Sequence, residues 1–385
     1  MNKRFATLDV MRGLTVAFMC IVNNPGNWGK LYPPLAHAHW DGCTPTDLVF
    51  PFFVFCMGCA MAFSLARYDG FTREATWKIV RRGLAIVLVG LLLNLYPFYP
   101  YSPHDASWNF GENYIYWLQH KRFLGVLQRI GFTYIVAGLV ILGVKKRAVR
   151  IGAAILALFT VWTAGLVLLS EAPGPFTLEG TWAPKVDEFL FGQNHLYRAY
   201  PTAGGGSRWF DPEGMWGVLT CTCTALLGFL AGEFVRDSQK AHAAAPEEEN
   251  SPVGVVARLF FAGMILLSLA MVLSVWIPVN KPLWTPSYVL YAGGWAYVVL
   301  AFLSYLIDVR GHERIFTPAR AMGMNALMAF VLSGVIAKTF GWIGWSPAKY
   351  FRATEFTSLC HAVLFMLVIF SFQWFFYKKK IVIKL

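Results

Sequence analysis

The chain has 385 residues, of which 57% are hydrophobic and only 14% carry a charge, and its formal net charge is +12. A soluble domain has about 25% charged residues, so these charges are too few to cover the two or three soluble domains that the length would allow. The composition therefore excludes an ordinary cytosolic enzyme, a disordered chain and a nucleic-acid-binding protein, and it predicts a polytopic membrane protein.

Apolar runs recur along the whole chain. A helix needs about 20 apolar residues to cross the hydrocarbon core of a bilayer, and ten segments meet that length. We therefore expect an all-α bundle of about ten transmembrane helices, forming a single domain over residues 1–385. The predicted spans are 8–24, 47–66, 79–98, 123–144, 149–169, 215–235, 257–277, 285–307, 319–338 and 357–377.

Lysine and arginine are unevenly distributed between the two sets of connections. The termini and every second connection carry 21 of them, including the run Lys145 to Arg150, whereas the opposite connections carry 10. Cytoplasmic loops are enriched in these residues, so we expect both termini in the cytoplasm. The net positive charge follows from this asymmetry, needs no nucleic acid, and favours contact with anionic membrane lipid.

The first predicted span contains two charged side chains. Asp9 and Arg12 are three residues apart, so they lie on one helix face and can pair. The pair is either structural or an anion-binding guanidinium oriented by its carboxylate. Asn23 closes the same span, about 21 Å from Asp9 at the helical rise, so one helix can contact both ends of a long ligand.

The connection after this span contains His37 and His39, followed by Trp40 and Asp47. An imidazole can act as a base near neutral pH. Asp47 is either a favourable charge at the start of the second helix or the group that orients a catalytic histidine. Two histidines with a nearby aspartate can bind zinc, but no third ligand motif accompanies them, so we expect no metal.

Further polar residues occur where apolar ones are expected. Arg129 lies deep in the fourth span and needs a partner or a ligand anion. Asp211 and Pro212 have the pattern of a helix start, which leaves Glu213 near the membrane surface without an assigned partner. Trp40 belongs to a set of loop tryptophans that fit either an interfacial belt or a sugar site.

Three later features complete the sequence. Residues 236–256 contain an alanine run and three consecutive glutamates, which predicts a flexible cytoplasmic linker. Asn280 and Lys281 fall in a short turn bounded by Pro278 and Trp284. Asn325 lies within the ninth span, where an amide usually bonds a neighbouring helix.

Several motifs occur in an order that resembles the heparan-α-glucosaminide N-acetyltransferase family, in its shorter bacterial form without the luminal domain. They run in order over nearly the whole chain, and their ordered set is far more specific than any one of them. In chain order, the motifs are Leu8-Asp9-Val10-Met11-Arg12-Gly13, Val22-Asn23, His37, Trp40-Asp41-Gly42, Asp47-Leu48-Val49-Phe50-Pro51, Leu127-Gln128-Arg129-Ile130-Gly131, Asp211-Pro212-Glu213-Gly214, Pro278-Val279-Asn280-Lys281-Pro282-Leu283-Trp284 and Gly323-Met324-Asn325.

The resemblance implies a bacterial inner-membrane enzyme that takes acetyl from cytosolic acetyl-CoA and places it on the amine of a glucosamine-type sugar on the periplasmic side. It assigns the catalytic histidine to His37 and the nearby asparagine to Asn23. A small amino sugar or cell-wall fragment is then expected as the acceptor, in place of heparan. Relatives suggest a homodimer.

We expect His37, Asn23 and Asp47 to carry the chemistry. His37 acts either as a general base or as a nucleophile that carries the acetyl group, and Asn23 faces the developing oxyanion. Two further groups of residues are expected to hold the substrates. They are Arg12, Arg129 and Asp9 for acetyl-CoA, and Trp40, Asp211, Glu213 and Asn280 for the acceptor.

The alternative function is a transporter or flippase for an amino sugar or glycolipid, because a ten-span bundle with buried charges suits that class too. Inverted repeats would favour it, and none is evident. Formation of an acetylated product without a sealed vesicle distinguishes the enzyme from a carrier.

Overall fold

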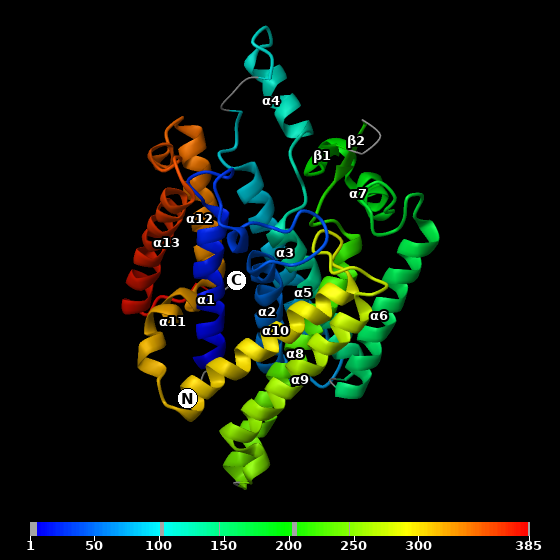
Figure 1. Cartoon of the computed structure of the whole chain (residues 1–385), viewed down its shortest axis with the longest axis vertical. Helices are drawn as coiled ribbons and strands as arrows, with labels where there is room; N and C mark the ends of the chain where they lie inside the picture. Colours follow the sequence, from blue (N-terminus) through cyan, green and yellow to red (C-terminus); the bar gives the residue numbers. More distant parts are fainter. Residues whose placement is uncertain (1–5, 101–103, 146, 202–205, 246, 384–385) are drawn as a thin grey trace.

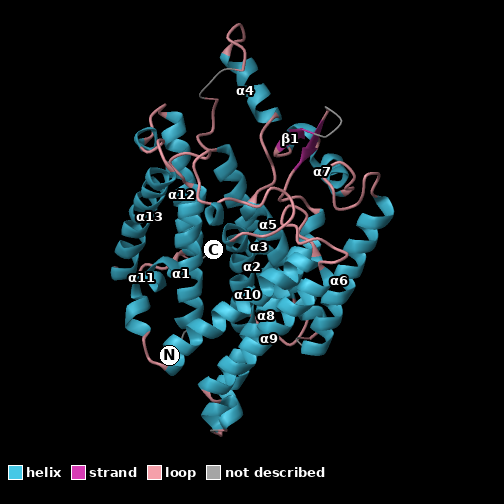
Figure 2. Cartoon of the chain, viewed as in Figure 1, coloured by secondary structure: helices cyan, strands magenta, loops and turns pink. Residues whose placement is uncertain are grey.

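The computed structural model describes residues 6–100, 104–145, 147–201, 206–245 and 247–383. Lys3, Arg4, Lys146 and Lys384, which contribute to the charge asymmetry, lie outside the described residues. The described chain is a bundle of long α-helices with one small antiparallel sheet (Figures 1 and 2). The prediction of an all-α polytopic membrane fold is therefore confirmed.

The helices and strands follow one another in chain order. The helices are α1 (Ala6–Asn23), α2 (Val49–Ser64), α3 (Arg73–Leu95), α4 (Phe110–Gln119), α5 (Val126–Gly143), α6 (Ala148–Leu169), α7 (Ala183–Phe191), α8 (Trp216–Ala244), α9 (Pro252–Leu273), α10 (Pro286–Ser304), α11 (Thr317–Met324), α12 (Ala326–Trp342) and α13 (Glu355–Lys378). Between α7 and α8, β1 (Arg198–Pro201) pairs with β2 (Ser207–Phe210), with Arg198 opposite Phe210.

The number of spans differs from the ten that the sequence predicts. Among the described residues, eight helices are long and apolar enough to cross a membrane, or up to nine if a bent pair is one span. A helix is present at each of the ten predicted places, but α3 does not have the composition of a span. It begins at Arg73, and so it includes the cations Lys78, Arg81 and Arg82 in its first half.

The predicted span 319–338 is not continuous. Residues 313–324 and 326–342 form two helices that are bent by 66° at Asn325. The side chain of Asn325 bonds the extended segment after α13: its amide nitrogen donates to the Ile381 carbonyl at 2.9 Å, and its oxygen accepts from the Ile383 N–H at 2.9 Å. Asn325 thus lies at a helix break, and in place of the expected bond to a neighbouring helix it bonds a non-helical segment.

Two of the long polar connections fold at the same end of the bundle. The connection 99–122 contains α4, and 170–214 contains α7 and the β1–β2 sheet, and all of these lie at the upper end in Figure 1, whereas α1 begins at the lower end. Which side of a membrane each end faces stays a prediction.

The segment 236–256 contains more helix than the predicted flexible linker. Helix α8 continues to Ala244, a short turn covers Glu248–Asn250, and α9 begins at Pro252. Ser251 caps α9 by accepting a bond from the Gly254 N–H at 3.1 Å, and Pro252 occupies the first helical position, where its missing N–H costs nothing. Pro246 lies outside the described residues.

Small residues let the helices approach one another closely. A Cβ on Gly13 of α1 would lie 1.7 Å from the Ala319 carbonyl oxygen of α11, and a Cβ on Gly323 would lie 1.8 Å from that of Asp9. Such contacts are typical of helix pairs in membranes. Because this contact includes Asp9 and neighbours Arg12, it also fixes the charged part of α1 against the broken helix.

Candidate active site

A cavity of about 900 Å³ lies between α1, α2, α3, α5 and α12. The cations Arg12, Lys78 and Arg82 line it on the first half of α1 and of α3. Farther along are its outer polar residues: Asn23, His37, Glu213 and Lys281. Arg12 and Asn23 are both on α1 and are about 16 Å apart at the helical rise, so the cavity follows much of that helix.

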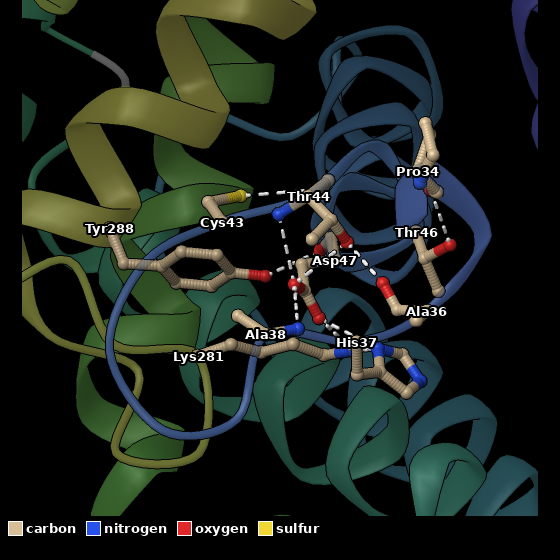
Figure 3. A network of polar contacts seen from close by, with 10 residues as sticks. All are labelled: Pro34, Ala36, His37, Ala38, Cys43, Thr44, Thr46, Asp47, Lys281 and Tyr288. Carbon is tan, nitrogen blue, oxygen red and sulfur yellow. Dashed lines mark hydrogen bonds and ion pairs between the residues drawn. The ribbon is translucent and has the colours of Figure 1, made fainter. Parts of the chain in front are cut away.

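His37 and Asp47 lie side by side, as Figure 3 shows. The Nδ1 atom of His37 is 2.7 Å from Oδ1 of Asp47. The imidazole is half exposed, at 49%, whereas the carboxylate is 2% exposed. A carboxylate only accepts hydrogen bonds, so Nδ1 donates, and in the neutral imidazole Nε2 is then the acceptor. The arrangement therefore presents an acceptor nitrogen to a substrate.

Asp47 also fixes the loop that carries the histidine. Its Oδ2 accepts from the backbone N–H groups of Ala38 and Thr44, each at 3.0 Å, and from the Thr44 hydroxyl at 3.1 Å. The Tyr288 hydroxyl donates to the main-chain oxygen of Asp47 at 2.6 Å. Both interpretations of Asp47 thus describe contacts that are present: it caps the turn before α2, and it bonds the histidine.

Lys281 is part of this site, although it is not among the site residues that the sequence predicts. Its Nζ is 3.2 Å from Oδ1 of Asp47 and 3.2 Å from Nδ1 of His37. The only sequence signal is its place in a Pro-bounded turn between two spans. The contact joins residues more than 230 positions apart, which neither periodicity nor spacing can reveal.

Asn280 holds this turn in place from a fully buried position. Its amide nitrogen donates to Oδ1 of Asp41 at 3.0 Å, and its oxygen accepts from the Leu283 N–H at 2.8 Å. The Gly42 N–H also donates to the Val279 carbonyl at 2.7 Å. These bonds dock the histidine loop on the turn, so Asn280 positions the site and does not line its cavity.

Arg122 joins the two acidic residues of the Asp-Pro-Glu motif. Its Nε is 2.7 Å from Oδ2 of Asp211, and its Nη2 also bonds Glu213. Burial would lower the pKa of Arg122, but attraction to Glu213 and Asp211 raises it above its usual value. Burial would likewise raise the pKa of Glu213, but Arg122 lowers it, so the carboxylate that lines the cavity is ionised.

The Asp211 motif forms a turn and not the start of α8. The Asp211 side chain accepts from the Glu213 N–H at 2.9 Å, and α8 begins later, at Trp216. Asp211 is buried and held by Arg122. Trp40 donates from its indole N–H to the Phe176 carbonyl at 2.7 Å and contacts Phe210 edge-on. We therefore expect Asp211 and Trp40 to position other residues, and Glu213 to be the acidic residue that lines the cavity.

Arg129 is almost completely buried, at 1% exposure, and lies behind the cavity wall. Its Nη2 donates to the Gly214 carbonyl at 2.6 Å, and its guanidinium lies 5.2 Å from the Trp284 ring centre. Within the described residues its Nε and Nη1 have no hydrogen-bond partner. Arg129 thus supports the turn that contains Glu213. A direct contact between Arg129 and acetyl-CoA, which the sequence analysis expects, stays a prediction.

The inner cations are held individually. Arg12 is 3.5 Å from Oδ1 of Asp9, as the spacing predicts. Lys78 donates to the Ser64 carbonyl at 3.2 Å, and the Arg82 guanidinium lies 5.3 Å from the Tyr134 ring centre. Within the described residues no group of three or more His, Cys, Asp or Glu side chains is placed to hold a metal ion.

These features define a multi-pass membrane protein with a charged cavity that is lined by a carboxylate-bound histidine. The family model described as heparan-alpha-glucosaminide N-acetyltransferase, catalytic, matches residues 4–180. The chain is therefore similar to that family over this region, and the resemblance that its motifs predict is confirmed. The matched region contains His37, Asn23, Asp47 and the inner cations.

Two curated relatives match over most of the chain. The heparan-alpha-glucosaminide N-acetyltransferase of Homo sapiens is 29% identical over 371 residues, which cover 85% of this chain and 52% of the human protein. That of Mus musculus is 28% identical over 384 residues, which cover 88% of this chain and 54% of the mouse protein. The chain thus spans about half the length of the curated relatives that it matches.

Proposed function

We propose that the chain is a transmembrane acetyltransferase that moves acetyl from cytosolic acetyl-CoA to the amine of a glucosamine-type sugar on the periplasmic side of a bacterial inner membrane. The observation that carries the proposal is one cavity that has cations toward one end and a carboxylate-bound histidine toward the other. Because its lining comes from α1 through the segment after α13, we propose that residues 1–385 act as one domain.

The inner cations suit the phosphates of the donor. Arg12, Lys78 and Arg82 line the cavity together, and clustered cations are the usual protein partners of phosphate groups. Asp9 would hold Arg12 in place. The apolar middle of the cavity would then surround the pantetheine arm, with the thioester near Asn23 and His37.

The outer residues suit a protonated amino sugar. The Glu213 carboxylate lines the cavity, so it would attract the ammonium group before the sugar loses its proton to water. The neutral amine then attacks the thioester carbonyl. The C–N bond forms, the C–S bond breaks, His37 Nε2 takes the proton from the amine nitrogen, and that proton passes to the departing thiolate.

Asn23 would stabilise the intermediate of this reaction. Its side chain lines the same cavity as the histidine, and an amide N–H there can donate to the developing oxyanion. Transfer through an acetyl-histidine would use the same groups but adds a covalent step: Nε2 bonds the acetyl carbon as the C–S bond breaks, and the amine then displaces the imidazole. We favour direct transfer, because donor and acceptor can meet in one cavity. A homodimer stays a prediction.

The test uses the purified protein in detergent with labelled acetyl-CoA and glucosamine. We expect N-acetylglucosamine and free CoA in equal amounts, and we expect His37→Ala to lose at least about 100-fold in rate, the usual contribution of a general base, while still binding CoA. His39→Ala, on the same exposed loop, is the matched control and keeps its activity.

Two outcomes would contradict the proposal. No acetylated sugar from a panel of amino sugars, together with their uptake into sealed vesicles, would make the chain a transporter. Undiminished turnover by His37→Ala would leave an acetyltransferase whose chemistry does not involve this histidine.

A further inference from the structure

Lys281 has no part in the mechanism above, yet it is built into the catalytic pair. Its Nζ lies 3.2 Å from the same carboxylate oxygen that binds His37, and Figure 3 shows both side chains converging on Asp47. Lys281 is 21% exposed and Asp47 2%. A buried carboxylate is therefore shared between a fixed cation and an imidazole.

The hydrogen-bond arithmetic separates the roles of the two oxygens of Asp47. Oδ2 is occupied by Ala38 and Thr44. Oδ1 alone remains for Nδ1 of His37 and Nζ of Lys281, and because a carboxylate only accepts, both donate to it. The 3.2 Å separation between Nζ and Nδ1 is then a contact between two donors, which places a positive charge beside the imidazole.

The charge balance gives this contact a consequence. A buried carboxylate without a counter-ion stabilises a neighbouring imidazolium, and an imidazolium cannot accept a proton. With Lys281 in place, the carboxylate and the ammonium together are neutral. The turn holds the ammonium there, because Asn280 and Val279 bond the histidine loop itself.

We propose that Lys281 is a positioning residue that serves as the counter-ion of Asp47, so that His37 meets the acceptor as a neutral imidazole with Nε2 free. The inference rests on the proposed function and deepens it. Two further carboxylates belong to the elements around the imidazole: Glu213 forms an ion pair with Arg122, and Asp41 accepts a hydrogen bond from Asn280. Cys43 on the same loop is neutral, because burial raises its pKa to about 12.

The first test compares Lys281→Met with Lys281→Arg. In Lys281→Met, the acidic limb of kcat/KM for the acceptor should move to higher pH by about one unit, the size of effect that a charge at this distance has, and the rate near pH 6.5 should fall several-fold. Lys281→Arg keeps the charge and should restore the limb. The titration of the acceptor amine is common to all three proteins and cancels.

The second test reads the protonation state of His37 without any activity. Diethyl pyrocarbonate modifies neutral imidazole, and peptide mass spectrometry separates His37 from His39 on the same loop. The rate of modification of His37 relative to His39, at pH 6.5, should fall several-fold in Lys281→Met and recover in Lys281→Arg.

The outcomes separate this inference from the proposed function. A loss in Lys281→Met that is uniform across pH, with an unchanged modification ratio, would make Lys281 merely structural and overturn the inference alone. An unaltered pH profile with full activity would overturn it as well. Failure of the wild type to acetylate any amino sugar would overturn the proposed function, whatever the modification ratio shows.

Discussion

Asp47 satisfies two requirements at once, which explains why its sequence context supports two interpretations. One oxygen caps the turn before α2, and the other bonds the histidine. A cap residue is fixed by backbone N–H groups, so it is a rigid support for a catalytic side chain. The motifs of His37, Asp47 and Asn23 are local in the sequence, so these residues could be selected from it, and their catalytic roles stay predictions.

The residues that the sequence could not assign act over long separations. Lys281 reaches His37 across 244 positions. Lys78 and Arg82 lie around the start of the predicted span 79–98, and only the packing of α3 shows that both line the cavity. Asn280, Asp211 and Arg129 bond Asp41, Arg122 and Gly214, and a direct contact of these residues with a substrate stays a prediction.

Asp187 gives a residue-level prediction about stability. It is 2% exposed, and burial raises its pKa to about 7, although the Met215 N–H donates to it at 2.7 Å. An acid with a raised folded-state pKa binds its proton more tightly when folded. The free energy of unfolding therefore falls as pH rises from about 4 to about 7.

Asp187→Asn should remove this dependence. The amide oxygen can still accept from the Met215 N–H and carries no charge to desolvate. As pH rises, the free energy of unfolding of the variant should therefore increase relative to that of the wild type. The difference should reach up to about 4 kcal/mol at neutral pH, since one pKa unit corresponds to about 1.4 kcal/mol. The Tm measured from pH 4.5 to 8 checks this. A difference in Tm that does not change with pH would contradict it.

At the scale of elements, the break at Asn325 is the largest departure from the expected spans. Asn325 has φ −124° and ψ 46°, which ends α11, and its amide then bonds the backbone on either side of Val382. Hydropathy predicts one continuous helix there, because the amide is a single polar residue in an apolar run. The bonding partner lies more than 50 positions away.

Asn325→Ala should release the segment after α13 from the cavity wall. It removes two backbone hydrogen bonds worth about 1 kcal/mol each, so local opening should become roughly 10- to 30-fold more frequent. The measurement is the rate at which a maleimide labels Val382→Cys, with and without Asn325→Ala. Ser333→Ala is the control, since Ser333 bonds only within its own helix, to Phe330. Equal labelling rates in all three backgrounds would show that Asn325 does not hold the segment.

At the scale of the whole molecule, charge and hydropathy predicted most of the fold. Helices form at all ten expected places, and two of the long polar connections fold at one end. The count falls to eight or nine clear spans because α3 starts with cations and because Asn325 breaks a helix. Both exceptions lie at the cavity, where the requirements of a ligand compete with those of a lipid environment.

The most direct test of the proposed function is a sided assay in proteoliposomes that hold glucosamine inside and receive labelled acetyl-CoA outside. Protein whose two termini face outward should produce N-acetylglucosamine inside the vesicles, and His37→Ala in the same orientation should produce none. Product that forms only when both substrates are on the same side would contradict the account.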